Sequence, residues 1–273
     1  MPNGAASPTL ARSSPAPAAP AERARRLMRA CDRATLATAQ RPDEAAPATA
    51  GWPYPSLVLV AFDHDGSPLL LLSTLADHTR NLLADDRVGL LFDGTAGLAQ
   101  PLTGARLSVL GRAVRSDDPG HRARYLRRHP DAALYAGFGD FAIYRVAVER
   151  AHLVAGFGRI HWLSAAELDL PHPAPALAAG EAELLDRLNA DGLGPALGPS
   201  GAGDAEQVPD PAPNQDSWSL TGVDPEGCDL RRGGYVARVD FEQRIHDPES
   251  ARLALDALVR IRRGSGAAGG REV

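Results

Sequence analysis

Apolar residues recur with a period of two or of nearly four over most of the chain, and this pattern is missing at its start. Residues 1–20 are dominated by alanine, proline and serine without an apolar period, which predicts a disordered tail. Residues 21–32 place Leu27 and Met28 on one side and arginines elsewhere, which is typical of a short amphipathic helix. The ordered part of the protein is therefore expected to begin near residue 21.

Short β-branched and apolar segments predict an antiparallel sheet. The expected strands are residues 34–38, 56–62, 68–73, 87–92, 105–115, 141–148 and 152–155. The clearest pair is a hairpin of 56–62 and 68–73, because the Asp63-His-Asp-Gly66 turn ends in an Asp-Gly that supplies a positive φ. Helices are expected over 77–84, capped by Asp77, and over 117–129, ended by His129-Pro130. Hairpins with inserted helices predict a small antiparallel barrel with covering helices.

The last third of the chain has a pattern of its own. An Ala/Pro linker over 171–179 precedes an amphipathic helix over 181–191 and a Gly/Pro-rich loop over 194–214. Strands over 218–221, 227–231 and 235–241 and a closing helix over 248–263 complete a compact α+β module. We therefore place a domain boundary near residue 172. It separates a barrel domain (21–171) from a C-terminal module (180–264).

Composition narrows the class of protein. Hydrophobic residues make up 44% and charged residues 23% of the 273 residues, as in ordinary globular proteins. No apolar run reaches about 18 residues, which argues against a membrane span. No secretory signal is visible, so the expected location is the cytoplasm. The net charge of -5 argues against nucleic-acid binding. Cys31 and Cys228 fit neither a metal spacing nor a disulfide framework.

All 29 basic side chains are arginines, since the sequence contains no lysine. Schiff-base chemistry and a Walker-type phosphate loop both need a lysine amine, so both are excluded. A bound anion must therefore be held by arginine, histidine, hydroxyl or backbone N–H groups.

One junction gathers groups that suit a phosphate. A strand is expected to end at Ser73 and a helix to begin near Asp77, so that His78, Thr79, Arg80 and Asn81 fall in its first turn. A helix N-terminus offers unpaired N–H groups and a positive dipole. An ordinary helix cap with a solvated face is the alternative that the spacing alone favours.

Further polar groups are more ambiguous. Arg106 and Arg112 share one face of a strand and would bind an anion only if that face lines the barrel mouth. Arg124, Tyr125, Arg127, Arg128 and His129 form a basic patch on one helix, for which a solvated face is the favoured interpretation. His161 and His172 follow the barrel. They are either solvent-exposed or axial ligands to haem iron.

The ordered segments resemble the pyridoxamine 5'-phosphate oxidase-like FMN-binding split barrel, and within it the haem-utilisation (HugZ-like) branch. The resemblance rests on short motifs whose order and spacing match over roughly residues 22–263. They are Gly51-Trp-Pro-Tyr-Pro-Ser-Leu-Val-Leu-Val60, His78-Thr-Arg-Asn-Leu82, Arg106-Leu-Ser-Val-Leu-Gly111, Arg124-Tyr-Leu-Arg-Arg-His-Pro130, Gly139-Asp-Phe-Ala-Ile-Tyr-Arg145 and Val154-Ala-Gly-Phe-Gly-Arg159. The C-terminal part resembles the α+β module that often follows this barrel, through Leu188-Asn-Ala-Asp191 and Gly222-Val-Asp-Pro-Glu-Gly227.

The resemblance implies a homodimer with FMN or haem bound between subunits. For FMN it implies a phosphate site made by Ser73, His78, Thr79, Arg80 and Asn81, with Arg106 nearby. His78 stands where flavin-binding members usually carry a lysine, and a neutral imidazole offers one donor against three. For haem it implies that His161 or His172 ligates the iron and that Arg106 or Arg128 pairs with the propionates.

Two classes of function therefore remain open. The first is a cytoplasmic homodimer that uses FMN or haem for redox chemistry or haem degradation. The second is a non-catalytic carrier or regulatory module that keeps the barrel without a cofactor, since no clear general acid or base is present. A deazaflavin-type or pyridoxal-phosphate oxidase ranks lower, because arginine alone would have to hold a highly charged phosphate cofactor.

Overall fold

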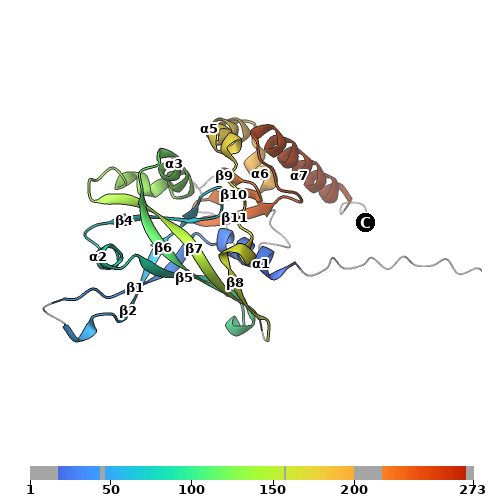
Figure 1. Ribbon diagram of the computed structural model, residues 1–273. Helices are drawn as coiled ribbons and strands as arrows, with labels where there is room; N and C mark the ends of the chain where they lie inside the picture. Colours follow the sequence, from blue (N-terminus) through green and yellow to red (C-terminus); the bar gives the residue numbers. More distant parts are fainter. Residues whose placement is uncertain (1–17, 44–46, 157, 200–216, 269–273) are drawn as a thin grey trace, which may run out of the picture.

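The computed structural model describes residues 18–43, 47–156, 158–199 and 217–268. The predicted tail up to residue 17 and most of the predicted loop 194–214 lie outside these ranges. Figure 1 shows a curled sheet with α1 beside it and a second, smaller sheet with its own helices on the other side of α1. This is the expected α+β architecture, a split antiparallel barrel followed by a small α+β unit.

The barrel part contains most of the strands. Its elements are α1 (Pro20–Ala30), β1 (Arg33–Ala39), η1 (Pro47–Thr49), β2 (Pro53–Leu59), β3 (Ala61–Phe62), β4 (Pro68–Ser73), α2 (Asp77–Ala84), β5 (Arg87–Gly94), η2 (Pro101–Thr103), β6 (Ala105–Ser116), α3 (Pro119–Arg128), η3 (Pro130–Leu134), β7 (Phe141–Ala155), β8 (Ile160–Ser164) and α4 (Ala165–Leu168). Every pair of neighbouring strands is antiparallel.

The eight-stranded sheet runs in the order β2-β1-β5-β6-β7-β4-β3, with β8 added to β7. Alternate residues point to opposite faces of a strand, and one face of this sheet is the core. Leu36, Leu90, Phe92, Leu107 and Leu153 are almost fully buried on that inner face. Met28 of α1 packs into the same cluster. The other face carries the exposed side chains of the same strands.

The predicted hairpin of 56–62 and 68–73 is only partly right. Its turn forms as expected, with Gly66 at φ 84° and the Asp63 N–H donating to the Ser67 carbonyl at 2.9 Å. The first strand, however, is divided at Val60, whose N–H donates to the Asp32 carbonyl at 2.9 Å. β2 pairs along its whole length with β1, and only the two residues of β3 pair with β4. The local turn signal could not show that the distant segment 33–39 competes for the same strand.

The strands predicted over 141–148 and 152–155 form one strand, β7, of 15 residues. Its partner register shifts between Leu110 and Gly111, so a bulge bends the long ribbon instead of interrupting it. β8 and α4 were not predicted. Gly156 (φ 99°) and Gly158 (φ 73°) flank the return from β7 to β8.

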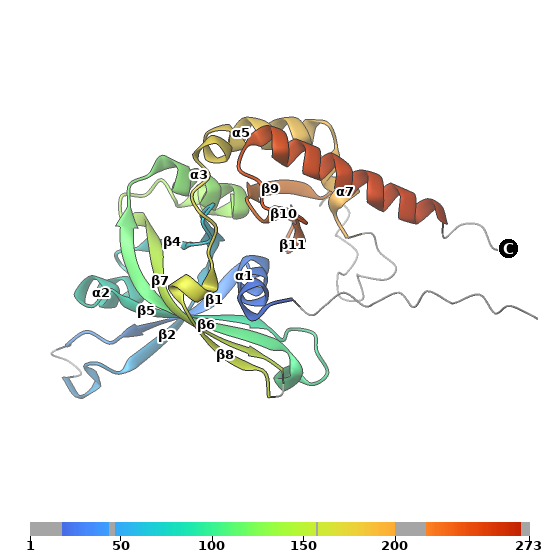
Figure 2. The same ribbon diagram turned by 45° about the vertical axis from the view of Figure 1, so that its right-hand side comes forward.

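The C-terminal part has the predicted meander and closing helix. Its elements are α5 (Pro175–Ala190), α6 (Leu193–Leu197), β9 (Ser219–Asp224), β10 (Gly227–Arg232), β11 (Tyr235–Asp240) and α7 (Pro248–Ala268). The sheet order is β11-β10-β9, and α7 lies along α5 in Figure 2. A separate apolar cluster runs from Ala174 to Val259. α5 begins inside the segment expected to be a linker, and the domain boundary near residue 172 stays a prediction.

None of the helices in the described ranges is long and apolar enough to cross a membrane.

Candidate functional site

A groove of about 340 Å³ lies where the edge strand β2 faces β4 at the opening of the curled sheet. α2 begins at one side of it, and aromatic side chains from α3 and the segment after it lie at another. The lining residues are Leu57, Val58, Leu59, Leu71, Leu72, Ser73, Ala76, His78, Tyr125, Tyr135 and Phe141. The volume falls within the range of about 300–1,000 Å³ that is usual for small-molecule sites. Most of the lining is apolar or aromatic.

Exposed apolar side chains extend this surface beyond the groove. Leu57 is 71% exposed, and Leu75, next to the lining residue Ala76, is 69% exposed. Leu134, next to Tyr135, is 81% exposed. The Phe138 ring lies 6.5 Å from that of Phe141. An apolar surface of this extent commonly marks a ligand site or an interface.

Ser73 lies at the end of β4 with its hydroxyl already engaged. Its Oγ donates to Asp140 Oδ2 at 2.5 Å and accepts the Leu75 N–H at 3.1 Å. The same Asp140 accepts the Thr74 N–H through its carbonyl at 2.8 Å. These bonds fix the turn between β4 and α2, which positions the next residues of the groove.

His78 is the histidine of the groove, and its side chain lies partly in solvent. Its Nδ1 is 3.1 Å from Ser56 Oγ on β2. Burial lowers the pKa of His78 below its usual value, and the Asp77 carboxylate offsets part of that effect. The imidazole is therefore neutral near pH 7, which is the form that binds metals.

The other residues predicted for the phosphate do not share the groove. Thr79 and Asn81 are fully buried, and the Asn81 amide donates to Thr38 Oγ1 at 3.1 Å and accepts the Arg41 N–H at 3.1 Å. The Arg80 side chain is 45% exposed, with its closest acid, Asp77, at 3.9 Å. Two helix positions separate it from His78, so the two side chains point in different directions.

Asp77 does not cap α2, in contrast to the prediction. The N-cap is Ala76, which has no side chain able to accept, and Asp77 is the first helical residue. Its carboxylate instead accepts from Arg41 at 3.1 Å. Sequence spacing placed the helix correctly but misplaced its cap by one residue.

Arg106 lies at the other end of the β6–β7 ribbon from this groove. Arg106 pairs across the sheet with Val154, whereas Ser73 pairs with Phe141. At the usual rise per residue, Val154 and Phe141 are about 40 Å apart along β7. The Arg106 guanidinium donates to the Leu102 and Gly104 carbonyls at 3.1 and 3.3 Å. Ser73, Arg80 and Arg106 are therefore not brought together within one chain.

The predicted haem ligands also lie away from the groove. His161 is on β8, opposite Leu153 on the far part of β7. His172 is exposed in the segment before α5. A feature that the sequence did not indicate is His152, which stacks on Trp162 with ring centroids 4.3 Å apart. Arg150 lies 4.2 Å from the same indole ring.

The basic patch of α3 is buried, so its interpretation as a solvated face was wrong for most of its members. Arg124, Tyr125, Arg128 and His129 are each at most 7% exposed. Arg124 pairs with Glu181 of α5 and donates to the Val223 carbonyl at 3.1 Å. Arg128 pairs with Asp229 of β10 at 3.1 Å, so it is not free for a propionate. A helical pattern cannot show acids that approach from another part of the chain.

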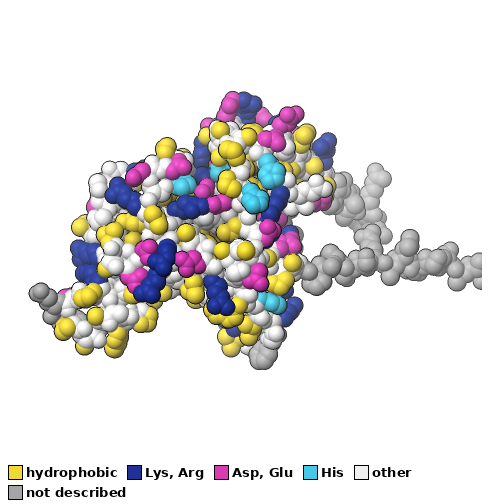
Figure 3. Space-filling model, viewed as in Figure 1, with side chains coloured by type: hydrophobic (Ala, Val, Ile, Leu, Met, Phe, Trp, Pro, Cys, Tyr) yellow, Lys and Arg dark blue, Asp and Glu magenta, His cyan; other side chains and the backbone are white. Residues whose placement is uncertain are grey.

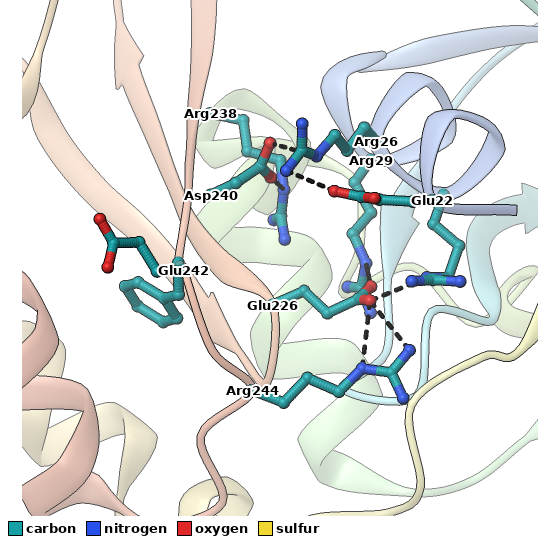
Figure 4. A pocket seen from close by; sticks show the side chains of 10 residues that line it. Glu22, Arg26, Arg29, Glu226, Arg238, Asp240, Glu242 and Arg244 are labelled. Carbon is teal, nitrogen blue, oxygen red and sulfur yellow. Dashed lines mark hydrogen bonds and ion pairs between the residues drawn. The ribbon is translucent and has the colours of Figure 1, made fainter. Parts of the chain in front are cut away.

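A second cavity, of about 270 Å³, lies between α1 and the small sheet (Figure 4). Arg25 pairs with Glu226 at 2.8 Å and Arg26 with Asp240 at 3.0 Å across it. Arg29 pairs with Asp224 at 2.8 Å. Since acids of the small sheet face these arginines, the cavity is a charged junction between the two parts and a poorer candidate for a cofactor than the groove. The described residues contain no cluster of three metal-ligating acids, histidines or cysteines.

The curled sheet, open between β2 and β4, defines the class of split β-barrel proteins. Comparison with known proteins agrees: the family model for the CREG β-barrel matches residues 15–168. The chain belongs to this family.

Two of the proteins that this chain resembles carry haem in their names. The chloroplastic heme oxygenase HOZ of Arabidopsis thaliana is 38% identical over 109 residues, which are 39% of this chain and 33% of HOZ. The match thus spans about a third of that relative. A heme binding protein from Mycobacterium smegmatis superimposes over 91% of this chain and 99% of its own, with 26% identity and a TM-score of 0.52. A protein of unknown function from Agrobacterium tumefaciens superimposes over 92% and 100%, with 26% identity and a TM-score of 0.68.

Proposed function

We propose that this protein binds haem in the groove between β2 and β4. The observation that carries the proposal is an apolar, aromatic groove that presents one half-buried, neutral imidazole. Such a lining suits a large apolar macrocycle. The names of two relatives, a heme oxygenase and a heme binding protein, support the same ligand.

The groove suits haem better than FMN. A flavin phosphate needs several donors converging on one point, but Thr79, Asn81 and Arg106 lie elsewhere and the Ser73 hydroxyl donates to Asp140. A porphyrin needs an apolar slot and a metal ligand, and both are present. Bound haem would supply redox chemistry at its iron, and the chain's own residues would bind and orient it. FMN binding stays a prediction.

We propose further that two copies complete the site. Register places Leu57, Thr35, Leu91, Ser108, His152 and Trp162 in one row across the outer face of the sheet. Leu91 is 41% and Trp162 49% exposed in this row. Leu57 also lines the groove, so the row leads directly to it. Figure 3 shows hydrophobic side chains exposed in the lower part of the molecule, interspersed with charged ones. A second copy on this face would cover the open side of the groove.

Titration with haemin tests the proposal. We expect an intense Soret band that saturates at one haem per chain, and no change in flavin fluorescence when FMN is added instead. Haem degradation would appear as loss of that band when a reductant is added in air. A haemin spectrum that is the same with and without the protein would contradict the proposed haem binding. It would favour a non-catalytic carrier or regulatory module without a cofactor.

A further inference from the structure

The groove contains only one of the chain's histidines. All eight histidines lie in the described ranges. His64 and His129 are buried, and His121 is held between Ser116 Oγ at 2.7 Å and Asp63 Oδ2 at 3.1 Å. His152 and His161 lie on the far part of the β7–β8 hairpin, and His172 and His246 lie outside the barrel. Only His78 lines the groove.

Neither buried histidine lines the groove: His129 Nδ1 has no hydrogen-bond partner, but it is buried in the core. His129 Nε2 is 2.9 Å from the Val60 carbonyl, and its ring packs 4.9 Å from that of Tyr125. His64 lies between Asp63, Arg124 and Glu181 at the junction with α5. A flat ligand of porphyrin size could reach neither ring without opening the core.

We propose that His78 Nε2 is the axial ligand of the haem iron and that Ser56 positions the imidazole for it. This inference rests on the proposed haem binding and assigns its ligand to α2, in place of His161 and His172.

The contact with Ser56 can hold the tautomer that acts as a ligand. When Nδ1–H donates to Ser56 Oγ, Nε2 keeps its lone pair and is the nitrogen available to iron. A hydrogen bond to the other ring nitrogen is the usual way in which proteins orient a ligating histidine. Because Ser56 is on β2 and His78 on α2, this contact also links the two sides of the groove.

Absorption and electron paramagnetic resonance spectra of the haemin complex test the inference. Wild-type protein is compared with His78→Ala, Ser56→Ala, His161→Ala and His172→Ala. We expect His78→Ala to shift the Soret band and change the spin state of the iron, and to weaken haemin binding about tenfold or more. Added imidazole should restore the histidine-ligated spectrum in this variant, which would not follow from damage to the fold.

The Ser56→Ala variant should keep histidine ligation but bind haemin more weakly, with a broader spectrum. The His161→Ala and His172→Ala variants should match the wild type. An unchanged spectrum in His78→Ala, with a changed one in His161→Ala or His172→Ala, overturns this inference and leaves haem binding intact. If wild-type protein binds no haemin, the proposed function itself fails.

Discussion

Glu181 shows how much a single buried acid can stabilise this molecule. It lies on α5 at 5% exposure, pairs with Arg124 of α3 and accepts the Val223 N–H at 2.8 Å. Burial alone would raise the pKa of Glu181, but Arg124 and His64 outweigh it and hold the pKa at about 2. Removing this carboxylate leaves the Arg124 guanidinium charged, buried and without its acid.

We predict that Glu181→Ala lowers the free energy of unfolding by about 3–5 kcal/mol near pH 7, because one partner of a buried ion pair is lost. The folded-state pKa lies below the usual value of 4.5, so the contribution is complete above that value and disappears as pH falls toward 2. The difference from wild type should shrink over that window. Urea unfolding at several pH values measures it.

Glu183→Ala is the matched control. It lies on the same helix and pairs with Arg187, but both side chains are at least 70% exposed. Surface pairs of this kind contribute about 0–1 kcal/mol. Equal losses in the two variants would contradict the role given to Glu181.

The contrast between buried and exposed ion pairs also explains what the sequence could not reveal about single residues. Arg124 and Arg127 belong to one run of basic residues on α3, yet Arg124 is buried against Glu181 and the Arg127 side chain is 30% exposed. Nothing local distinguishes them. The difference comes from α5, which is more than fifty residues away along the chain.

At the scale of elements, the bulge in the β6–β7 ribbon depends on Gly111. Leu110 faces Arg150 and Gly111 faces Val148, so Glu149 is the extra residue on β7. A Cβ at Gly111 would lie 2.2 Å from the Ala147 carbonyl oxygen. Since that atom belongs to the backbone, the ribbon itself would have to move.

We predict that Gly111→Ala lowers the free energy of unfolding by about 1–3 kcal/mol, as overpacking of a rigid site does. Gly89→Ala on the adjacent strand β5 is the control, because its Cβ would meet Ala37 and Leu110 side chains at an ordinary 3.7 Å. That change should stay within about 0.5 kcal/mol. Chemical denaturation of both variants measures the difference, and a Gly111→Ala variant as stable as Gly89→Ala would refute the assignment.

Turns and helices that are determined by residues close together in the sequence could be predicted from it. The turn from Asp63 to Gly66 and the helix over 77–84 follow from residues within a few positions of each other. Pairing could not be predicted, because β2 has two possible neighbours and its choice of β1 depends on the curvature of the whole sheet. The groove between β2 and β4 follows from that choice, so local sequence could not separate His78 and Ser73, which line the groove, from Thr79 and Asn81, which are buried outside it.

At the scale of the whole molecule, ion pairs join the barrel part to the C-terminal part, whereas apolar packing holds each core together. Arg29 and Arg238 both pair with Asp224, which is 1% exposed. The Arg29–Asp224 pair bridges α1 and the small sheet, and Arg238 of β11 holds Asp224 of β9 from within that sheet. The Arg124–Glu181 and Arg128–Asp229 pairs tie α3, which contributes Tyr125 to the groove, to the same C-terminal part.

The outer face of the sheet carries the exposed apolar row that we propose a second copy covers. Leu91 lies near its centre, between Thr35 and Ser108 across the sheet. We predict that Leu91→Arg converts a dimer of the wild-type protein into a monomer, because a charge cannot be buried unpaired in an apolar interface. Sedimentation equilibrium measures the mass. Leu253→Arg is the control, since Leu253 is an exposed apolar residue on α7 (53%) and should leave the dimer intact.

The dimer and the haem site then make a joint prediction. If a second copy covers the open side of the groove, Leu91→Arg should weaken haemin binding although Leu91 does not line the groove. Raising the protein concentration should strengthen haemin binding in the wild type until dimers dominate, because the ligand binds the dimer preferentially. The same mass for wild type and Leu91→Arg would mean that this face does not hold a dimer together. Equal haemin affinity in both would mean that this face and the groove are independent.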